Sequence, residues 1–579
     1  MDAIWNKRSF FKILLGGVAV GLFSHIFYTR QYTQVETPPT KVVVKDRVLD
    51  LPTENLYLGA DTERRDAVRT AFKPIARLVG VCHALSNQLA ERDAWGYDEY
   101  HPIARKGSNL SSGDGIGYTI IDSLRASDTI QLMGLSDEYD RARHWIASDL
   151  SFDVDDKFNT FETTIRVLGG LLSSYYLSSN PFSAHPTSPD TLFLDKAADL
   201  GERLLSSFDP TSGLPLSFVN LHTMEGIPDA DNRGFVSTAE AASLQLEFKW
   251  LSELTEDPTY WLKAEKVLQI IKDSPKRDGL VPIFIESVCF NISSPRTKQF
   301  YFSSIRLGSR ADSYYEYLLK QYLQTGSTEQ VYKDMYNEAR RGIKKHLLKM
   351  TQGPKKLVHT IELTPKRGAN GPEYRPYNKQ DHLVCFLPGL FLLGVHDGKN
   401  SLPLDQKAFT IQQHEDWWVG EELLKTCVSG IVCEAIHLKR YNQYDTYEST
   451  KTGLSPEIIH FHPIGSEKGK QEDWYIKPSA DQDIIDGRYI LRPETVESLF
   501  VAFRLSGNSK YREWGWKIFE SIERHTKISS GGYSNIKNVN KVPVDYEDKM
   551  ETFLLSETFK YLYLLFEDES VAPLDSEWK

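Results

Sequence analysis

The feature that most constrains the fold of this 579-residue sequence is a long series of segments with apolar residues at helical spacing. They come in neighbouring pairs and cover residues 161–178, 237–255, 259–273, 311–325, 331–349, 492–507, 510–526 and 550–566. A helix pair cannot bury its apolar face alone, so the pairs must stack, either as an open solenoid or as a closed ring. The sequence therefore predicts an all-α fold.

Short glycine-containing stretches follow these pairs. Each has a glycine followed by a large residue, which predicts a turn or a short β-hairpin. The four clearest begin at Gly213, Gly279, Gly453 and Gly532. We expect short hairpins at one end of the helix pairs.

Composition and charge narrow the functional class. Hydrophobic residues make up 40% of the chain and charged residues 25%, which is ordinary for a globular protein. The chain has 68 Lys and Arg against 79 Asp and Glu, a net charge of −11, and no basic block. A nucleic-acid partner requires a basic patch, so none is expected.

The N-terminal region predicts a membrane anchor. Residues 10–28 form an apolar stretch close to the length that crosses a bilayer, and Lys7 and Arg8 precede it, which favours a cytosolic N-terminus. The alternative is a signal peptide cleaved near Ala19. We expect a cytosolic tail at 1–9, a transmembrane signal anchor at 10–28, a lumenal stem at 29–60 and the main lumenal domain at 61–579, a single-pass type II arrangement.

A lumenal domain would fold in an oxidising compartment. The sequence has five cysteines, and their pairing does not follow from their spacing. The glycosylation sequons at Asn109 and Asn291 agree with this placement.

Acidic residues recur at the starts of the predicted helices. Glu162, Glu240, Asp312 and Glu494 each fall in a first turn. The simplest explanation is structural, because the helix macrodipole favours acids there and Ser237 with Glu240 fits a capping box. In a closed ring, however, alternate helices run the same way and would gather these acids at one mouth. Glycoside hydrolysis needs such a site, with one carboxylic acid to protonate the leaving oxygen and a carboxylate to activate water.

Several ordered stretches resemble the class I α-1,2-mannosidases, glycoside hydrolase family 47. They are GIGYTI at 115–120, FETTIRVLGG at 161–170, RADSYYEY at 310–317, DHLVCFLPG at 381–389, LRPETVES at 491–498 and SETFKYL at 556–562. The resemblance implies an (α/α)7 barrel and an inverting exo-α-1,2-mannosidase that trims high-mannose N-glycans on glycoproteins. It also implies a location in the membrane of the endoplasmic reticulum or the Golgi.

The resemblance further implies roles for particular residues. Glu162, Asp312 and Glu494 match the three core acids, with Glu494 as the general base and Glu162, or alternatively Asp312, as the acid. Residues matching the substrate pocket are Arg166, Glu240, Arg310, His382, Arg492, Glu497, Phe553 and Glu557. Cys385 and Cys427 match the family's disulfide, and the family binds one Ca²⁺ that would hold sugar hydroxyls and the reacting water.

The sequence also departs from the family pattern. The family's calcium-binding threonine lies in an Asn-Thr-Glu-Ala-His-Pro-like segment after the last helix, and this sequence has no such segment. Residues 74–90, 125–127 and 428–440 interrupt the pattern. One hypothesis is that they come from retained intron or misplaced exon boundaries, which a continuous coding transcript would refute. If they are genuine, we expect them to loop out from the surface.

Two functional hypotheses follow. The first is the membrane-anchored mannosidase, favoured by the presence of all three acids. The second is a glycan-binding quality-control factor with the same fold and weak or no hydrolysis, favoured by the absent threonine.

Overall fold

The computed structural model describes residues 58–80, 94–179, 187–286, 300–353, 355–368, 371–396, 401–429, 450–462, 473–477 and 485–574. The chain divides into two units, residues 1–52 and residues 53–579, and the description below concerns the second. The predicted tail, anchor and most of the stem lie outside the described residues, as do Asn291, Cys82, Cys289 and Cys433. Over the ranges given above, no helix is long and apolar enough to cross a membrane.

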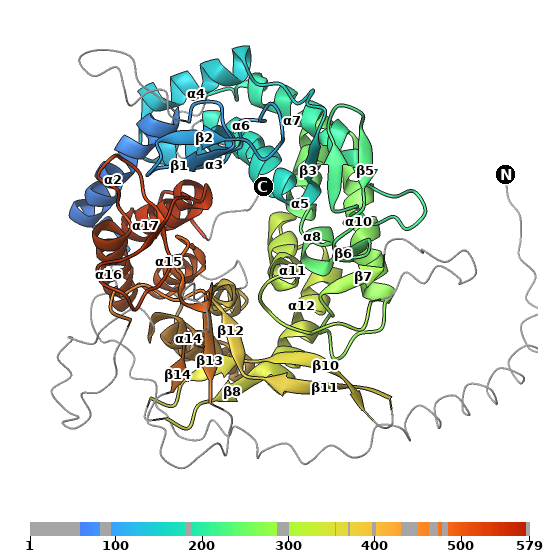
Figure 1. The fold of residues 1–579 in the computed structure, drawn as a ribbon. Helices are drawn as coiled ribbons and strands as arrows, with labels where there is room; N and C mark the ends of the chain where they lie inside the picture. Colours follow the sequence, from blue (N-terminus) through green and yellow to red (C-terminus); the bar gives the residue numbers. More distant parts are fainter. Residues whose placement is uncertain are drawn as a thin grey trace, which may run out of the picture. The chain divides into compact units, whose positions relative to one another are not determined.

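One set of helices runs around a central space in the second unit (Figure 1). In this set α3 contacts α6, α6 contacts α9, and the contacts continue through α11, α13, α15 and α17, which contacts α3. The members are α3 (Tyr118–Leu132), α5 (Thr160–Glu162), a π-helical turn (Thr163–Leu168), α6 (Gly169–Ser178), α8 (Thr238–Ala241), α9 (Gln245–Thr255), α11 (Asp312–Gln324), a 3-10 turn (His382–Phe386), α13 (Leu387–Leu393), α15 (Glu494–Ser506), a π-helical turn (Leu554–Thr558) and α17 (Phe559–Phe566).

A second set of helices packs on the first. The contacts pair α2 with α17, α4 with α3, α7 with α6, α10 with α9, α12 with α11, α14 with α13 and α16 with α15. This set consists of α2 (Thr62–Gly80), α4 (Ser136–Ser148), α7 (Thr191–Leu205), α10 (Pro258–Asp273), α12 (Gln330–Gly342) with the π-helical turn Ile343–Leu347, α14 (Ile411–Ser429) and α16 (Lys510–His525). The apolar faces of both sets form one continuous core, so the prediction of stacked helix pairs is confirmed.

Short antiparallel strands join the helices. The two-stranded pairs are β1 (Glu99–His101) with β2 (Lys106–Ser108), β6 (Phe235–Ser237) with β7 (Phe284–Glu286), β8 (Leu348–Met350) with β9 (Val358–Thr360), β10 (Glu362–Gly368) with β11 (Gly371–Tyr377), and β15 (Asn535–Ile536) with β16 (Tyr546–Glu547). In the three-stranded sheets, β4 (Phe218–Asn220) lies between β3 (Lys157–Asn159) and β5 (Glu225–Ile227), and β13 (Ile458–Phe461) lies between β12 (Lys379–Asp381) and β14 (Trp474–Tyr475). Single 3-10 turns lie at Gln406–Ala408 and Ile485–Gly487.

The predicted glycine turns are confirmed. Gly213, Gly279, Gly453 and Gly532 all have positive φ, between 69° and 82°. Gly279 also lies against α12, where a Cβ atom would stand 2.5 Å from the backbone nitrogen of Ala339. This turn therefore requires glycine both for its conformation and for its close packing.

Two expectations about individual segments can be compared with the structure. Cys385 and Cys427 form a disulfide that links the turn before α13 to α14. The expectation that 125–127 loops out is wrong, because these residues continue α3 within Tyr118–Leu132. Residues 74–80 likewise belong to α2, while 81–90 and 430–440 lie outside the described residues.

Candidate active site

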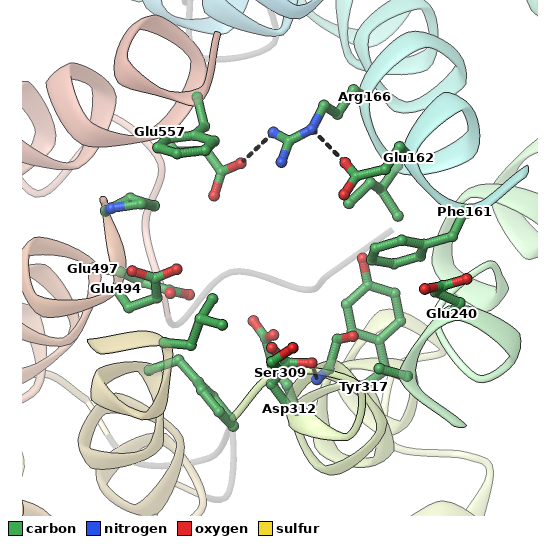
Figure 2. A pocket seen from close by; sticks show the side chains of 18 of the residues that line it. Phe161, Glu162, Arg166, Glu240, Ser309, Asp312, Tyr317, Glu494, Glu497 and Glu557 are labelled. Carbon is green, nitrogen blue, oxygen red and sulfur yellow. Dashed lines mark hydrogen bonds and ion pairs between the residues drawn. The ribbon is translucent and has the colours of Figure 1, made fainter. Parts of the chain in front are cut away.

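A cavity of about 440 Å³ opens among the helices of the first set. Its wall carries carboxylates from several helices (Figure 2). Among the described residues, eight acids line the cavity, against the four cations Arg166, Arg310, Lys320 and Arg492; the acids are Glu162, Glu240, Glu247, Asp312, Glu316, Glu494, Glu497 and Glu557. Acidic groups therefore outnumber basic groups by 8 − 4 = 4.

The acids predicted at helix starts do lie in first turns. Asp312 and Glu494 are the first residues of α11 and α15. Glu162 donates its backbone N–H to Oδ1 of Asn159, the N-cap of α5, at 2.8 Å. Ser237 caps α8 in the same way, accepting from the backbone N–H of Glu240 at 3.3 Å. The macrodipole stabilises these positions, and all four acids nevertheless line the same cavity.

Left-handed residues precede two of these acids. Arg310 has φ of 74° two positions before Asp312, and Leu491 has φ of 65° three positions before Glu494. A side chain with a Cβ pays a conformational cost there, and such residues gather at functional sites. The backbone is thus bent just before each acid enters the cavity wall.

Arg166 connects two acids across one part of the wall. Its Nε donates to Oε2 of Glu162 at 2.7 Å, and its Nη1 lies 3.4 Å from Oε1 of Glu557 (Figure 2). Nη1 is also 3.5 Å from Oδ2 of the buried Asp122. The guanidinium lies over the ring of Phe553 at 5.3 Å from its centroid. These contacts fix the orientation of Glu162 and Glu557.

Arg492 and Lys320 hold the acids of α15. Arg492 donates to both carboxylate oxygens of Glu457, at 2.8 and 2.6 Å, and its Nη1 lies 3.6 Å from Oε1 of Glu494. Lys320 donates to Oε1 of Glu497 at 3.1 Å and also to Glu316. Glu494 Oε2 is buried and has no hydrogen-bond partner among the residues that the structure describes. Glu494 is therefore the least compensated of these carboxylates.

Burial changes the protonation of several wall acids. It raises the pKa of Glu494 to about 8, with Arg492 opposing the shift. It raises the pKa of Asp312 to about 7, although the Ser313 N–H donates to its Oδ1 at 3.0 Å. Glu240 and Glu497 are also raised to about 7, again mainly by burial. Carboxyls that hold a proton near neutral pH are suited to acid–base catalysis.

Most of the residues predicted for the site meet in this cavity. Its lining includes Glu162, Arg166, Glu240, Arg310, Asp312, Arg492, Glu494, Glu497, Phe553 and Glu557. His382 is the exception and is not part of the lining. It is buried, its Nε2 lies 2.9 Å from Thr495 Oγ1, and burial lowers its pKa to about 4. A neutral His382 thus supports the first turn of α15 from behind the wall.

Several ion-pair partners of these residues were not predicted from the sequence. Glu457 pairs with Arg492, Lys320 with Glu497, and Asp122 with Arg166. Lys320 falls eight residues after Asp312, which places it two turns further along the same helix, so helical spacing was the available signal. Glu457 and Asp122 had no such signal, because neither lies on a helix that carries one of the predicted acids.

Comparisons with known proteins identify the family. The model of glycosyl hydrolase family 47 matches residues 90–578. The chain belongs to glycosyl hydrolase family 47. A mannosyl-oligosaccharide 1,2-alpha-mannosidase of Candida albicans is 42% identical over 497 residues, covering 84% of this chain and 78% of that protein. The family resemblance seen in the sequence is therefore confirmed.

Other members of family 47 show the same relationship. The endoplasmic reticulum mannosyl-oligosaccharide 1,2-alpha-mannosidase of Homo sapiens is 41% identical, covering 82% of this chain and 58% of that protein. Among solved structures, the alpha-1,2-mannosidase from Trichoderma reesei superposes with a TM-score of 0.68 at 25% identity, covering 88% of this chain and 95% of that one.

Family 47 is in general calcium-dependent, and a calcium site requires oxygen ligands that lie close together. No group of three or more His, Cys, Asp and Glu side chains in the described ranges comes together in a way that could hold a metal ion. Arg166, Lys320 and Arg492 already engage Glu162, Glu557, Glu497 and Glu494. The described ranges therefore show no preformed cluster of these side chains for the ion.

Proposed function

We propose that this family 47 glycosidase is an inverting exo-α-1,2-mannosidase that trims high-mannose N-glycans on glycoproteins. The observation that supports this most strongly is the convergence of Glu162, Asp312 and Glu494 on one cavity, although they lie far apart in the sequence. The cavity is concave and mainly polar, and its aromatic Phe553 lies beside two guanidinium groups. These features suit a sugar ring with hydroxyls at its edge and an apolar face.

Glu494 is the proposed general base. Its buried Oε2 has no hydrogen-bond partner among the described residues, and in the ionised form this carboxylate can accept a proton from water. Arg492 stabilises the ionised form and is itself held by both oxygens of Glu457. In the inverting reaction this water attacks the anomeric carbon from the face opposite the leaving oxygen.

Glu162 is the proposed general acid. In Figure 2 it lies on the wall across from Glu494, which leaves room between them for the sugar and the attacking water. Asp312 is the second candidate, because burial raises its pKa to about 7 and so favours its protonated form. α-Mannosyl fluoride distinguishes them, since fluoride departs without a proton. We expect Glu162→Gln to lose much less activity on the fluoride than on a glycan, and Asp312→Asn to lose activity on both.

The finer architecture belongs to the same proposal. The succession of contacts from α3 to α17 and back supports an (α/α)7 barrel, with the second helix set outside. We propose that the catalytic domain spans 61–579, and that 1–9, 10–28 and 29–60 are a cytosolic tail, a signal anchor and a stem. Relatives named for the endoplasmic reticulum support a type II protein of the endoplasmic reticulum or Golgi membrane. No step of this proposal is routed through calcium, because no cluster of His, Cys, Asp and Glu that could hold it is present among the described residues.

The experiment is the release of free mannose from a nine-mannose N-glycan by the full-length protein. We expect successive loss of α-1,2-linked mannose and no cleavage of α-1,6-linked mannose. A protein that binds the glycan but never shortens it would reject the enzymatic function in favour of the glycan-binding factor.

A further inference from the structure

An aromatic surface continues from the wall of the cavity onto the paired strands β6 and β7. β6 pairs with β7 so that Ser237 lies opposite Phe284 and Phe235 lies opposite Glu286. Side chains alternate along a strand, so Phe235 and Ser237 share one face, and Phe284 shares it as the cross-strand neighbour of Ser237. Ser237 lines the cavity. The face with the two phenylalanines therefore begins at the site.

Tyr301 enlarges this surface. Its backbone N–H donates to the carbonyl of Phe284 at 3.0 Å. Its ring stacks on Phe235 with centroids 4.4 Å apart and an angle of 25°, and Phe235 lies 6.3 Å from Phe284. The side chain of Tyr301 is nevertheless 37% exposed. An exposed tyrosine whose ring stacks on a second aromatic ring offers a ligand an apolar ring face together with a hydroxyl.

Arg310 joins the surface to the polar wall. Its guanidinium lies over the ring of Phe284, 5.1 Å from the centroid, and its Nη1 is 3.8 Å from Oε1 of Glu240. Both Arg310 and Glu240 line the cavity. A ligand lying across this junction meets aromatic faces, a guanidinium and a carboxylate in sequence. Such a mixture matches a carbohydrate, which has apolar C–H faces and hydroxyls at its edges, better than it matches an apolar peptide.

We propose that Phe235, Phe284 and Tyr301 form a second sugar-binding subsite. It would take a mannose ring of the same branched oligosaccharide whose terminal mannose occupies the cavity, and so it rests on the proposed function. An exo-acting enzyme buries only the end of its substrate, and the remaining rings lie outside the mouth. Contact with one of them adds binding energy that a disaccharide cannot supply.

The test compares substrates of different size. We measure kcat/KM for the nine-mannose glycan and for α-1,2-mannobiose, and take their ratio. Tyr301→Ala is expected to lower this ratio by about three- to tenfold, the usual range for one aromatic contact, and Tyr301→Phe, which keeps the ring, should retain most of it. Tyr176→Ala on α6 is the matched control, with a side chain 39% exposed, and should leave the ratio unchanged.

Three results would overturn the subsite. An equal loss on both substrates would mean that Tyr301 only supports the cavity wall, and no loss on either would mean that its ring is not used. A loss seen with a glycoprotein but not with the free glycan would assign the surface to polypeptide instead.

A binding titration separates this proposal from the proposed function. If the wild-type protein cleaves neither substrate, the proposed function fails. Calorimetric titration of the Glu494→Gln protein with the nine-mannose glycan then still tests the subsite, because adding Tyr301→Ala must weaken glycan binding by about the same factor. Unchanged binding in the double variant would refute it.

Discussion

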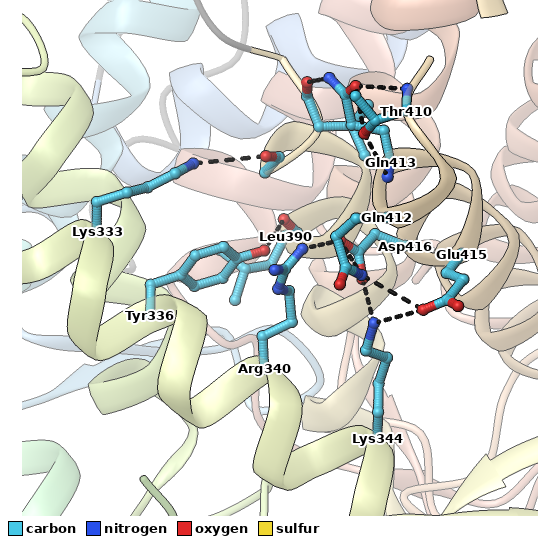
Figure 3. Close-up of polar contacts among 12 residues, drawn as sticks. Lys333, Tyr336, Arg340, Lys344, Leu390, Thr410, Gln412, Gln413, Glu415 and Asp416 are labelled. Carbon is cyan, nitrogen blue, oxygen red and sulfur yellow. Dashed lines mark hydrogen bonds and ion pairs between the residues drawn. The ribbon is translucent and has the colours of Figure 1, made fainter.

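The cavity and the interface between α12 and α14 both hold partly or fully buried carboxylates. The two regions differ in how completely cations and hydrogen-bond donors neutralise those carboxylates. In the interface, Asp416 is 1% exposed and contacts Arg340 as well as Lys344, whose Nζ lies 2.9 Å from its Oδ1 (Figure 3). Gln412 donates to both of its oxygens at 3.3 Å. Each oxygen of this buried acid is therefore satisfied.

In the cavity, by contrast, the acids are not all matched by cations. The described lining holds four more acids than cations, and Glu494 keeps a buried oxygen with no hydrogen-bond partner in the described part of the chain. An unpaired buried carboxylate costs stability and stays only where something else requires it. The comparison suggests that the charges of the interface serve the fold, while those of the cavity serve the reaction at the expense of the fold.

The largest expected effect is on catalysis. Glu494→Gln removes the base but keeps the shape of the side chain, so we expect kcat to fall by about 10²- to 10⁴-fold. Glycan binding should persist, which calorimetric titration can show. Undiminished hydrolysis would reject the assignment of the base.

Asp416→Ala tests whether the buried charges between α12 and α14 stabilise the fold. It leaves Arg340 and Lys344 without their shared buried partner, so the free energy of unfolding should fall by about 3–5 kcal/mol. Chemical denaturation measures this loss, and kcat of the folded protein should be that of the wild type. A stable variant would show that the interface charges are not structural.

The pH dependence of stability should separate the two regions. Burial raises the pKa of Glu494 to about 8, so the folded state favours the protonated form. That stability is fully present below the ordinary glutamate pKa and is lost as pH rises through about 8, with a slope of about 1 kcal/mol per pH unit in between. Glu494→Gln should flatten this decline between pH 5 and 8. An unchanged slope in denaturation curves would contradict the shift.

The smallest expected effects come from two helix caps. Asn159 caps the helix of Glu162, and Asp257 caps α10 by accepting from the Thr259 N–H at 2.8 Å. Replacing either by Ala should cost about 1 kcal/mol of stability. Only Asn159→Ala should also lower kcat/KM severalfold, because it loosens Glu162. Equal kinetics for both variants would show that this cap does not position the acid.

Helical periodicity predicted much of the fold. The segments at 259–273 and 510–526 match α10 and α16 within one residue at each end, because both helices have one apolar face and one polar face. The segment at 237–255 was predicted as one helix but breaks between α8 and α9, at Ala242–Leu244. Helical periodicity did not predict α13, because every residue of Leu387–Leu393 is buried and the helix therefore has no polar face.

The site was predicted less directly. Acids at helix starts were visible, but a capping role explains each of them equally well until the folded helices bring them together in one cavity. The family motifs supplied the rest, including His382, which the structure places behind the wall rather than in it. The pairing of Arg492 with Glu457 joins residues 35 positions apart and needed the three-dimensional fold to be seen.

In the proposed reaction, water activated by Glu494 attacks the anomeric carbon from the side opposite the leaving oxygen. Proton NMR of the first mannose released from an α-1,2-linked glycan tests it most directly. With inversion, β-mannose appears first and then mutarotates. Initial release of α-mannose would contradict it.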